Sequence, residues 1–503
     1  MRLFSMSLGQ ARRRLVQAGA AFAAVALIAG CGSNYQPVVT PITPSGPAAQ
    51  PGSYAVVVSA PSTTTPGIAT IIDYSGDSVL ALAPIGNGPV TFTIDALGGN
   101  GYTVNSDGTL SNFPISSSLQ AKQVEYTTLP ATAIPVNLFS PSSGLYAADL
   151  SGDVADVFSG FPQAFKLSIP VAATPVMIVG PSVSGQREFA LSQNVTNPTG
   201  VECNNAPTSQ PIGSADGIEL SSFTVSSNIP LGKCPIYAVA SSDSKRLFVM
   251  NRGDDTISVI NEQDNTLDTC TPFLNQSGQT VNCHPTLPLS LGAVTATGIT
   301  PPNGTAGMTP TAGPVYAEYN TATAQLIVAN YDGGTISVID VSEDLYGNDS
   351  STFGTTYTIP VGNNPASVTV LADGSRAYTA NQTDQTVTIV TLSSHTVEKT
   401  LPVTGHPRTV VSTQNSQFGK VYVASPDSPY LTILRTDLDI LDTTVLVEGN
   451  IVDVRATTQT GTSGNSNTGS RRPGFGQPCY LPPSLEPAPT GTQTALQVCR
   501  TLP

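Results

Sequence analysis

The chain has 503 residues, of which 39% are apolar and only 11% are charged, and its formal net charge at pH 7 is −14. The length allows a large hydrophobic core. Nucleic-acid binding needs clustered Lys and Arg, so this acidic composition argues against a nucleic-acid partner. The 45 Gly and 42 Pro residues are spread along the chain, which is typical of many short strands and turns.

The N-terminus combines basic, apolar and small residues in a fixed order. Arg12, Arg13 and Arg14 precede an uncharged, mostly apolar run over residues 15–28, and two small residues then lead to Cys31. A run of this length is too short to span a hydrocarbon core ~30 Å thick. A permanent transmembrane helix is therefore not expected here.

This order resembles a bacterial lipoprotein signal peptide. The resemblance implies cleavage before Cys31 and lipidation of its sulfur, so that residues 1–30 are the signal and the membrane is reached through a lipid anchor. Gly32, rather than Asp, follows the cysteine, which implies sorting to the outer membrane of the cell envelope, facing the periplasm or the surface. An ordinary secretory signal cleaved further on is the alternative, and the arginines leave open the Sec and twin-arginine export routes.

Residues 31–52 are rich in Pro, Ser and Thr and predict a flexible tether. Residues 1–30 hold four of the 20 basic residues and none of the 34 acidic ones, so the rest of the chain carries a net charge of −18. A basic patch that docks on an anionic membrane is therefore not expected.

A repeat dominates the second half of the chain. Residues 245–260, 324–339 and 375–390 each read as an alternating strand, a turn of Asn, Asp and Gly, and a second alternating strand, and residues 420–434 form a weaker copy. A Gly followed closely by Pro precedes three of these copies, at 232–235, 362–365 and 405–407. Pro365 and Pro407 are 42 residues apart, the length of a four-stranded blade.

These copies resemble the YVTN-type β-propeller repeat, named for a Tyr-Val-Thr-Asn strand end. The strand end survives as Phe-Val-Met-Asn at 248–251, Ile-Val-Ala-Asn at 327–330 and Tyr-Thr-Ala-Asn at 378–381. The resemblance is specific over residues 232–447, whereas the sequence over residues 53–231 is only compatible with the repeat. It implies an all-β propeller, with a pair of β-sandwiches as the alternative architecture.

Innermost strands starting near residues 89, 135, 175, 235, 314, 365, 407 and 451 predict eight blades, with seven as the alternative. Residues 54–85 read as a blade without its innermost strand, and residues 449–455 supply one spare strand. Pairing of these two segments would close the ring and leave it without a gap. We therefore expect the propeller over residues 53–457, followed by a Gly-, Ser-, Thr- and Pro-rich tail over 458–503.

Six cysteines follow Cys31, and an even number in an exported protein predicts disulfides. Proximity in the sequence favours the pairs Cys203–Cys234, Cys270–Cys283 and Cys479–Cys499, the last within the tail. Free buried thiols are the alternative.

The loops that enter each blade and the turns between its second and third strands share one face of a propeller. The repeat places nine candidate binding residues there: Asn251, Arg252, Asp254, Asn330, Tyr331, Asp332, Asn381, Asp384 and His406. The alternative is structural, because Asn and Asp in turns commonly satisfy backbone groups.

No catalytic residue is predicted. The three histidines, His284, His395 and His406, fall in different blades or insertions, and the hydrolase, phosphate-loop and zinc-protease motifs are absent from the sequence. We therefore expect no cofactor and no metal, and enzymatic activity is left open but not expected.

The sequence as a whole predicts a monomeric, lipid-anchored envelope propeller that acts as a binding or scaffold module for a protein or polymer. The alternative function is a lactonase-like hydrolytic propeller with its site in the central funnel.

Overall fold

The computed structural model describes residues 53–457, except 142–143, 161–162, 181–185, 196–210, 275–277, 279, 291–310, 345–346 and 414. The chain divides into two units, residues 1–50 and 51–503, and every described residue belongs to the second. The predicted signal, the lipidation site Cys31, the tether and the tail therefore lie outside the described residues. No helix in the described ranges is long and apolar enough to cross a membrane.

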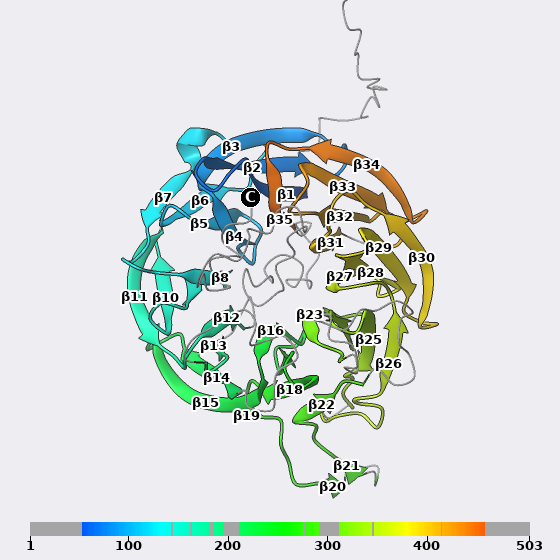
Figure 1. Ribbon diagram of the computed structural model, residues 1–503. Helices are drawn as coiled ribbons and strands as arrows, with labels where there is room; N and C mark the ends of the chain where they lie inside the picture. Colours follow the sequence, from blue (N-terminus) through cyan, green and yellow to red (C-terminus); the bar gives the residue numbers. More distant parts are fainter. Residues whose placement is uncertain are drawn as a thin grey trace, which may run out of the picture. The chain divides into compact units, whose positions relative to one another are not determined.

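In the described residues, eight antiparallel sheets are arranged in a ring, each a blade of four strands, with one further strand in the fifth blade; the first strand of each blade lies at the centre and the fourth at the rim (Figure 1). The protein is thus an eight-bladed β-propeller, as predicted, and the seven-blade and sandwich alternatives are wrong. We number the blades from 1 to 8 along the chain.

The strands of the first four blades, from centre to rim, are as follows. Blade 1 is formed by β35 (Asn450–Ala456), β1 (Tyr54–Ala60), β2 (Pro66–Asp73) and β3 (Val79–Asn87). Blade 2 is formed by β4 (Pro89–Ile94), β5 (Asn100–Asn105), β6 (Thr109–Pro114) and β7 (Glu125–Thr128), with a short 3-10 helix, η1 (Ala121–Gln123), before β7. Blade 3 is formed by β8 (Pro135–Phe139), β9 (Leu145–Asp149), β10 (Val154–Ser159) and β11 (Ala164–Pro170). Blade 4 is formed by β12 (Pro175–Val179), β13 (Arg187–Ser192), β14 (Ile212–Glu219) and β15 (Thr224–Lys233).

The remaining blades follow the same order. Blade 5 is formed by β16 (Pro235–Ala240), β17 (Arg246–Asn251), β18 (Thr256–Asn261) and β19 (Thr266–Leu267), with β22 (Thr286–Pro288) also paired to β18. Blade 6 is formed by β23 (Pro314–Asn320), β24 (Gln325–Asn330), β25 (Thr335–Asp340) and β26 (Thr356–Pro360). Blade 7 is formed by β27 (Pro365–Val370), β28 (Arg376–Asn381), β29 (Thr386–Thr391) and β30 (Thr396–Pro402). Blade 8 is formed by β31 (Thr409–Thr413), β32 (Lys420–Ala424), β33 (Tyr430–Arg435) and β34 (Ile440–Leu446).

The ring closes through its two ends. β35, from the end of the described chain, pairs antiparallel with β1, so that Val57 lies opposite Val454. Both side chains are fully buried, as is Ile451 at the start of the pairing. The predicted closure is therefore confirmed, and it completes blade 1 with residues from both ends of the propeller.

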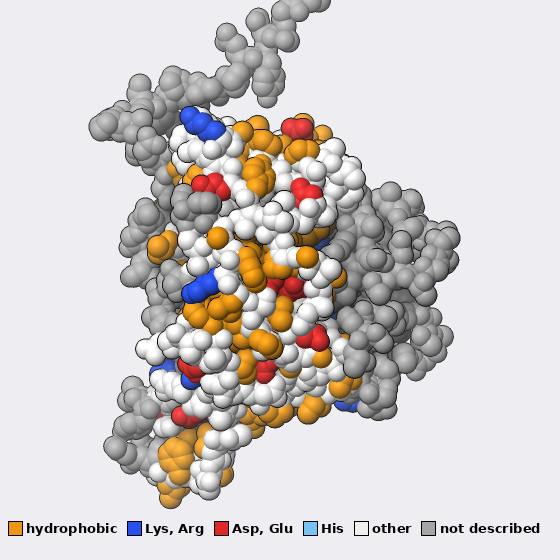
Figure 2. All heavy atoms as spheres, turned by 90° about the vertical axis from the view of Figure 1, so that its left-hand side faces the viewer, with side chains coloured by type: hydrophobic (Ala, Val, Ile, Leu, Met, Phe, Trp, Pro, Cys, Tyr) orange, Lys and Arg blue, Asp and Glu red, His pale blue; other side chains and the backbone are white. Residues whose placement is uncertain are grey.

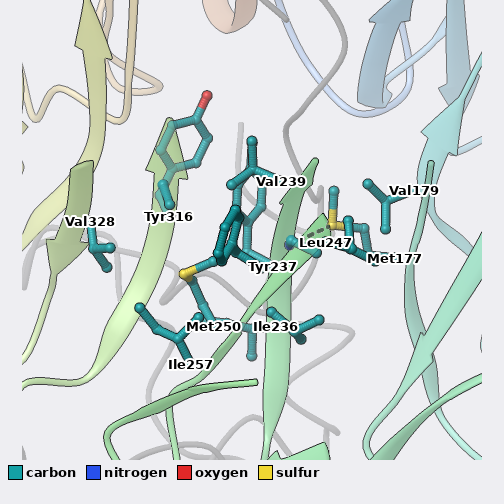
Figure 3. Close-up of a cluster of buried hydrophobic side chains, with 14 of the residues drawn as sticks. Met177, Val179, Ile236, Tyr237, Val239, Leu247, Met250, Ile257, Tyr316 and Val328 are labelled. Carbon is teal, nitrogen blue, oxygen red and sulfur yellow. Dashed lines mark hydrogen bonds between the residues drawn. The ribbon is translucent and has the colours of Figure 1, made fainter. Parts of the chain in front are cut away.

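The hydrophobic core lies between blades, because both faces of the inner strands pack against neighbouring sheets. Figure 3 shows this packing where Tyr237 of β16 meets Tyr316 of β23, with ring centroids 4.5 Å apart. On the other side of blade 5, the backbone N–H of Ala238 donates to Sδ of Met177 in blade 4 at 3.3 Å. Truncating such a buried aromatic residue to Ala would cost about 3–5 kcal/mol.

An insertion in blade 5 carries a stapled hairpin. Between β19 and β22 the chain forms β20 (Phe273–Leu274) and β21 (Thr280–Val281), which extend away from the ring (Figure 1). The predicted disulfide Cys270–Cys283 is confirmed and closes the base of this hairpin. Cys234 is also disulfide-bonded. Its predicted partner Cys203 lies outside the described residues, as do Cys479 and Cys499.

Candidate functional site

The candidate binding face, here called the upper face, is formed by the blade-entry loops and the turns between second and third strands. Asn251, Asn330 and Asn381 end the second strands of blades 5, 6 and 7, and all three are fully buried. Each side-chain amide donates to two hydroxyl groups at the start of the next strand. The Nδ2–Oγ distances for Asn330 are 3.0 Å to Thr335 and 2.9 Å to Ser337.

The glycine of the blade-entry loop lies directly against this buried amide. A Cβ atom added to Gly232 would be 2.6 Å from Nδ2 of Asn251, and one added to Gly362 would be 2.7 Å from the amide of Asn381. No side chain fits in that space. The Gly and Asn of the repeat are therefore two parts of one contact, which explains why they recur together.

The aspartates of the turns hold the same loops from outside. Oδ2 of Asp254 accepts the backbone N–H of Lys233 at 2.9 Å, and Oδ2 of Asp384 accepts that of Asn363 at 2.7 Å. In blade 8 the equivalent acceptor is Asp427, which takes the N–H of His406 at 2.8 Å and lies 2.6 Å from its Nδ1. Asp254 and Asp384 are exposed, whereas His406 is half-buried.

Two side-chain pairs link blades 5, 6 and 7 beneath the upper face. The guanidinium of Arg252 donates from Nε and Nη2 to the two carboxylate oxygens of Asp332, at 3.0 and 2.8 Å, and both side chains are buried. The hydroxyl of Tyr331 donates to Gln382 of the next blade at 3.0 Å. In these contacts the turn residues hold loops and blades together. A ligand-binding role for the nine candidates stays a prediction.

Blade 3 carries two acids where blades 2, 5, 6 and 7 carry an amide and a hydroxyl. Asp149 ends β9 in the place of Asn330, and Asp156 on β10 takes the place of Ser337. Both are almost fully buried, and Oδ1 of Asp156 accepts the hydroxyl of Ser168 at 2.5 Å. Burial, reinforced by the Asp149 carboxyl group, raises the pKa of Asp156 to about 6. The pair was missed in the sequence analysis, because nothing in the sequence indicates that the two carboxyl groups share a site.

The opposite, lower face is held by charged contacts between neighbouring blades. The guanidinium of Arg246, at the start of β17, lies 2.6 Å from Asp349 and 3.0 Å from Asp268. Nδ1 of His284, next to the stapled cysteine, lies 2.6 Å from the other oxygen of Asp349. Lys420 of blade 8 forms the equivalent contact with Asp77 of blade 1, at 2.6 Å.

The histidines remain apart in the ring. His284 and His395 belong to lower-face contacts in different blades, where the ring of His395 stacks on Tyr357 with centroids 3.8 Å apart, and His406 belongs to the upper face. Within the described ranges, no group of three or more His, Cys, Asp or Glu side chains is placed to hold a metal ion.

The rim shows a recurrent exposed apolar side chain. In six blades the second residue of the outermost strand is a large hydrophobic residue that stays exposed; these residues are Tyr126, Phe165, Val225, Tyr357, Val397 and Leu441. Their exposed fractions run from 37% to 52%. Figure 2 views the ring from one side and shows hydrophobic side chains gathered in a band along the rim. We call these six residues the rim row.

Comparison with known proteins identifies the fold. No protein-family model and no curated protein sequence matches the chain. Among solved structures, apo AztD from Citrobacter koseri is 14% identical, with a TM-score of 0.52, and the match covers 80% of this chain and 97% of AztD. The dihydro-heme d1 dehydrogenase NirN is 13% identical, with a TM-score of 0.51 and coverage of 82% and 77%. The shared feature is the propeller fold. At this level of identity the likeness extends to the fold alone.

Proposed function

We propose that this protein is a lipid-anchored β-propeller of the bacterial envelope that binds a protein or polymer partner through its rim. The anchor is supported by the basic and apolar residues that lead to Cys31. The binding role is supported by the rim row, and this is the observation that carries the proposal.

Single exposed hydrophobic residues are common on protein surfaces and need no explanation. The rim row differs because the second residue of the outermost strand is apolar and exposed in six blades. Some of them also touch a neighbouring blade: the hydroxyl of Tyr126 donates to the carbonyl of Pro84 at 3.2 Å. That contact uses the hydroxyl group, and Tyr126 remains 52% exposed. Exposed apolar side chains that recur from blade to blade would supply the apolar contacts of a binding surface.

The partner-binding part is tested by placing charge on the rim. In envelope membranes that contain the processed lipoprotein, we expect chemical cross-linking to join the wild-type protein to a discrete partner, and Tyr126→Glu and Phe165→Glu to abolish that product. Lys122→Glu, an exposed charge change in the same blade as Tyr126, is the control and should retain the product. Retention of the product by both rim variants would refute binding through the rim.

The anchor is tested separately. Cys31→Ser removes the sulfur that would carry the lipid, so the variant should move from the detergent phase to the aqueous phase in detergent phase separation, because acyl chains supply most of the membrane affinity. An unchanged partition would refute the lipid anchor and leave the rim untested by that result, so the two parts of the proposal fail independently.

A further inference from the structure

The stapled hairpin of blade 5 is held to the ring at its base. Asp268, which precedes the hairpin, lies 3.0 Å from the guanidinium of Arg246, and Nδ1 of His284, which follows it, lies 2.6 Å from Asp349. The disulfide Cys270–Cys283 joins the two arms next to these contacts. A two-stranded hairpin alone is marginally stable in water, so the cross-link and the side-chain contacts give this one a fixed base.

Beyond this base the hairpin exposes two large apolar side chains. Phe273 and Leu274 form β20 and are 44% and 69% exposed, on an arm that projects away from the ring (Figure 1). They lie opposite Val281 and Thr280 of β21. Because successive side chains of a strand point to opposite faces, each face of the hairpin carries one of the two exposed residues. A single flat protein surface would cover one of these faces, whereas a lipid surface entered by the hairpin would cover both.

The hairpin is also uncharged. Residues 269–283 include no Asp, Glu, Lys, Arg or His, in a chain whose formal net charge is −14. The nearest charged residues are Asp268 and His284, and both are engaged at the base. Anionic lipids repel an acidic surface, and a charged side chain is costly within a membrane. A neutral segment with exposed apolar side chains meets neither cost, so its composition favours a lipid surface.

We propose that Phe273 and Leu274 insert into the surface of the bilayer to which the protein is anchored. This contact rests on the lipid anchor of the proposed function, because the anchor holds the ring next to a bilayer. Apolar side chains at the boundary between headgroups and acyl chains add affinity in proportion to the apolar area they bury. Two points of attachment restrict the orientation of the ring on the membrane, whereas one point leaves it free to turn.

Single-tryptophan fluorescence tests this contact, because the chain contains no Trp. Leu274→Trp places the fluorophore in the hairpin. Leu446→Trp, at the end of β34 in blade 8, is the matched control, since that leucine is 62% exposed. The processed full-length variants are reconstituted into vesicles of phosphatidylethanolamine and phosphatidylglycerol, and flotation reports their attachment. We expect Leu274→Trp to give blue-shifted emission that lipids with brominated acyl chains quench, and Leu446→Trp to give neither.

A second variant tests the chemistry of the contact with the same fluorophore. Phe273→Glu, added to Leu274→Trp, places a carboxylate next to the reporter. Because a charge is costly within a membrane, we expect this double variant to float with the vesicles through its anchor but to lose the blue shift and the quenching. A double variant that keeps both signals would overturn insertion of the hairpin.

The remaining outcomes separate the hairpin from the anchor. Water-like emission from Leu274→Trp on vesicles that carry the protein would overturn the membrane contact, leave the anchor standing and favour a protein partner for the hairpin. Equal shifts and quenching at positions 274 and 446 would overturn a contact made by the hairpin in particular. Failure of the wild-type protein to float with the vesicles would refute the anchor and, with it, the contact that rests on it.

Discussion

On the upper face, Asn251, Asn330 and Asn381 recur at the same place in three blades and are fully buried. On the rim, Tyr126 and Phe165 also recur at the second position of the outermost strand, but they remain about half exposed. The side-chain amides of these asparagines donate hydrogen bonds to hydroxyl groups of their own blade. The rim side chains remain partly exposed to water. Recurrence alone therefore does not indicate function: a residue repeated in each blade holds the blade when it is buried, and is available to a partner when it is exposed.

The comparison requires a closed ring, so the largest effect should follow from opening it. Deletion of residues 449–457 removes β35, which buries Ile451 and Val454 and covers the inner edge of β1. Without it, blade 1 lacks its innermost strand and the ring has an open edge. We expect loss of the cooperative thermal transition in circular dichroism or calorimetry. A deletion variant that melts cooperatively at the wild-type temperature would contradict the closure.

Breaking the buried pair under the upper face should have the next largest effect. Arg252→Met leaves the Asp332 carboxylate buried without its bidentate partner, which should lower the free energy of unfolding by about 3–5 kcal/mol in urea titrations. The double variant Arg252→Met with Asp332→Leu removes both charges and should recover most of that loss. Equal stability of the wild type and Arg252→Met would show that this pair does not hold blades 5 and 6 together.

The acid pair of blade 3 predicts a pH dependence that the amide–hydroxyl blades do not share. The folded-state pKa of Asp156 is raised to about 6, whereas an unfolded Asp titrates near 3.9, so the folded protein binds the proton more tightly. The resulting stabilisation is complete below about pH 4 and is lost as the pH rises through about 6, by at most about 3 kcal/mol.

Replacing Asp149 with Asn and Asp156 with Ser recreates the pair seen at Asn330 and Ser337. The double variant should therefore be more stable than the wild type at pH 7, with the difference shrinking towards pH 4. Parallel stability curves for the two proteins between pH 4 and 7 would contradict a shared titration.

A smaller contrast lies within the upper face itself. Asn330→Ala removes two buried hydrogen bonds and should cost about 1–3 kcal/mol of unfolding free energy, whereas Asp254→Ala removes an exposed acceptor and should cost about 1 kcal/mol or less. Thermal melts of the two variants check the order. If Asp254→Ala lowered the stability more than Asn330→Ala, the asparagines would serve a ligand rather than the stability of the blade.

Much of the fold followed from the sequence because period-2 alternation and turn residues are local signals. The prolines at 89, 135, 175, 235, 314 and 365 each begin an innermost strand as predicted, and only the last two starts differ, at Thr409 and Asn450 instead of 407 and 451. The closing strand followed from a count of strands at the two ends.

The sites did not follow in the same way, since they depend on contacts between residues far apart in the chain. A turn asparagine has the same sequence signature whether it binds a ligand or donates to a hydroxyl group on the next strand, so nothing in the sequence indicated that Asn330 is buried. Tyr126 and Phe165 fit the alternation of their strands, and only the outer position of those strands makes them exposed.

Site-specific photo-cross-linking in envelope membranes tests whether the partner binds the rim or the upper face. A photoreactive residue is placed in turn at two rim positions, 126 and 165, and at two exposed upper-face positions, 254 and 384. We expect cross-linking to a discrete partner from the rim positions and none from the upper face. Cross-links from positions 254 and 384 with none from 126 and 165 would contradict it and return binding to the upper face.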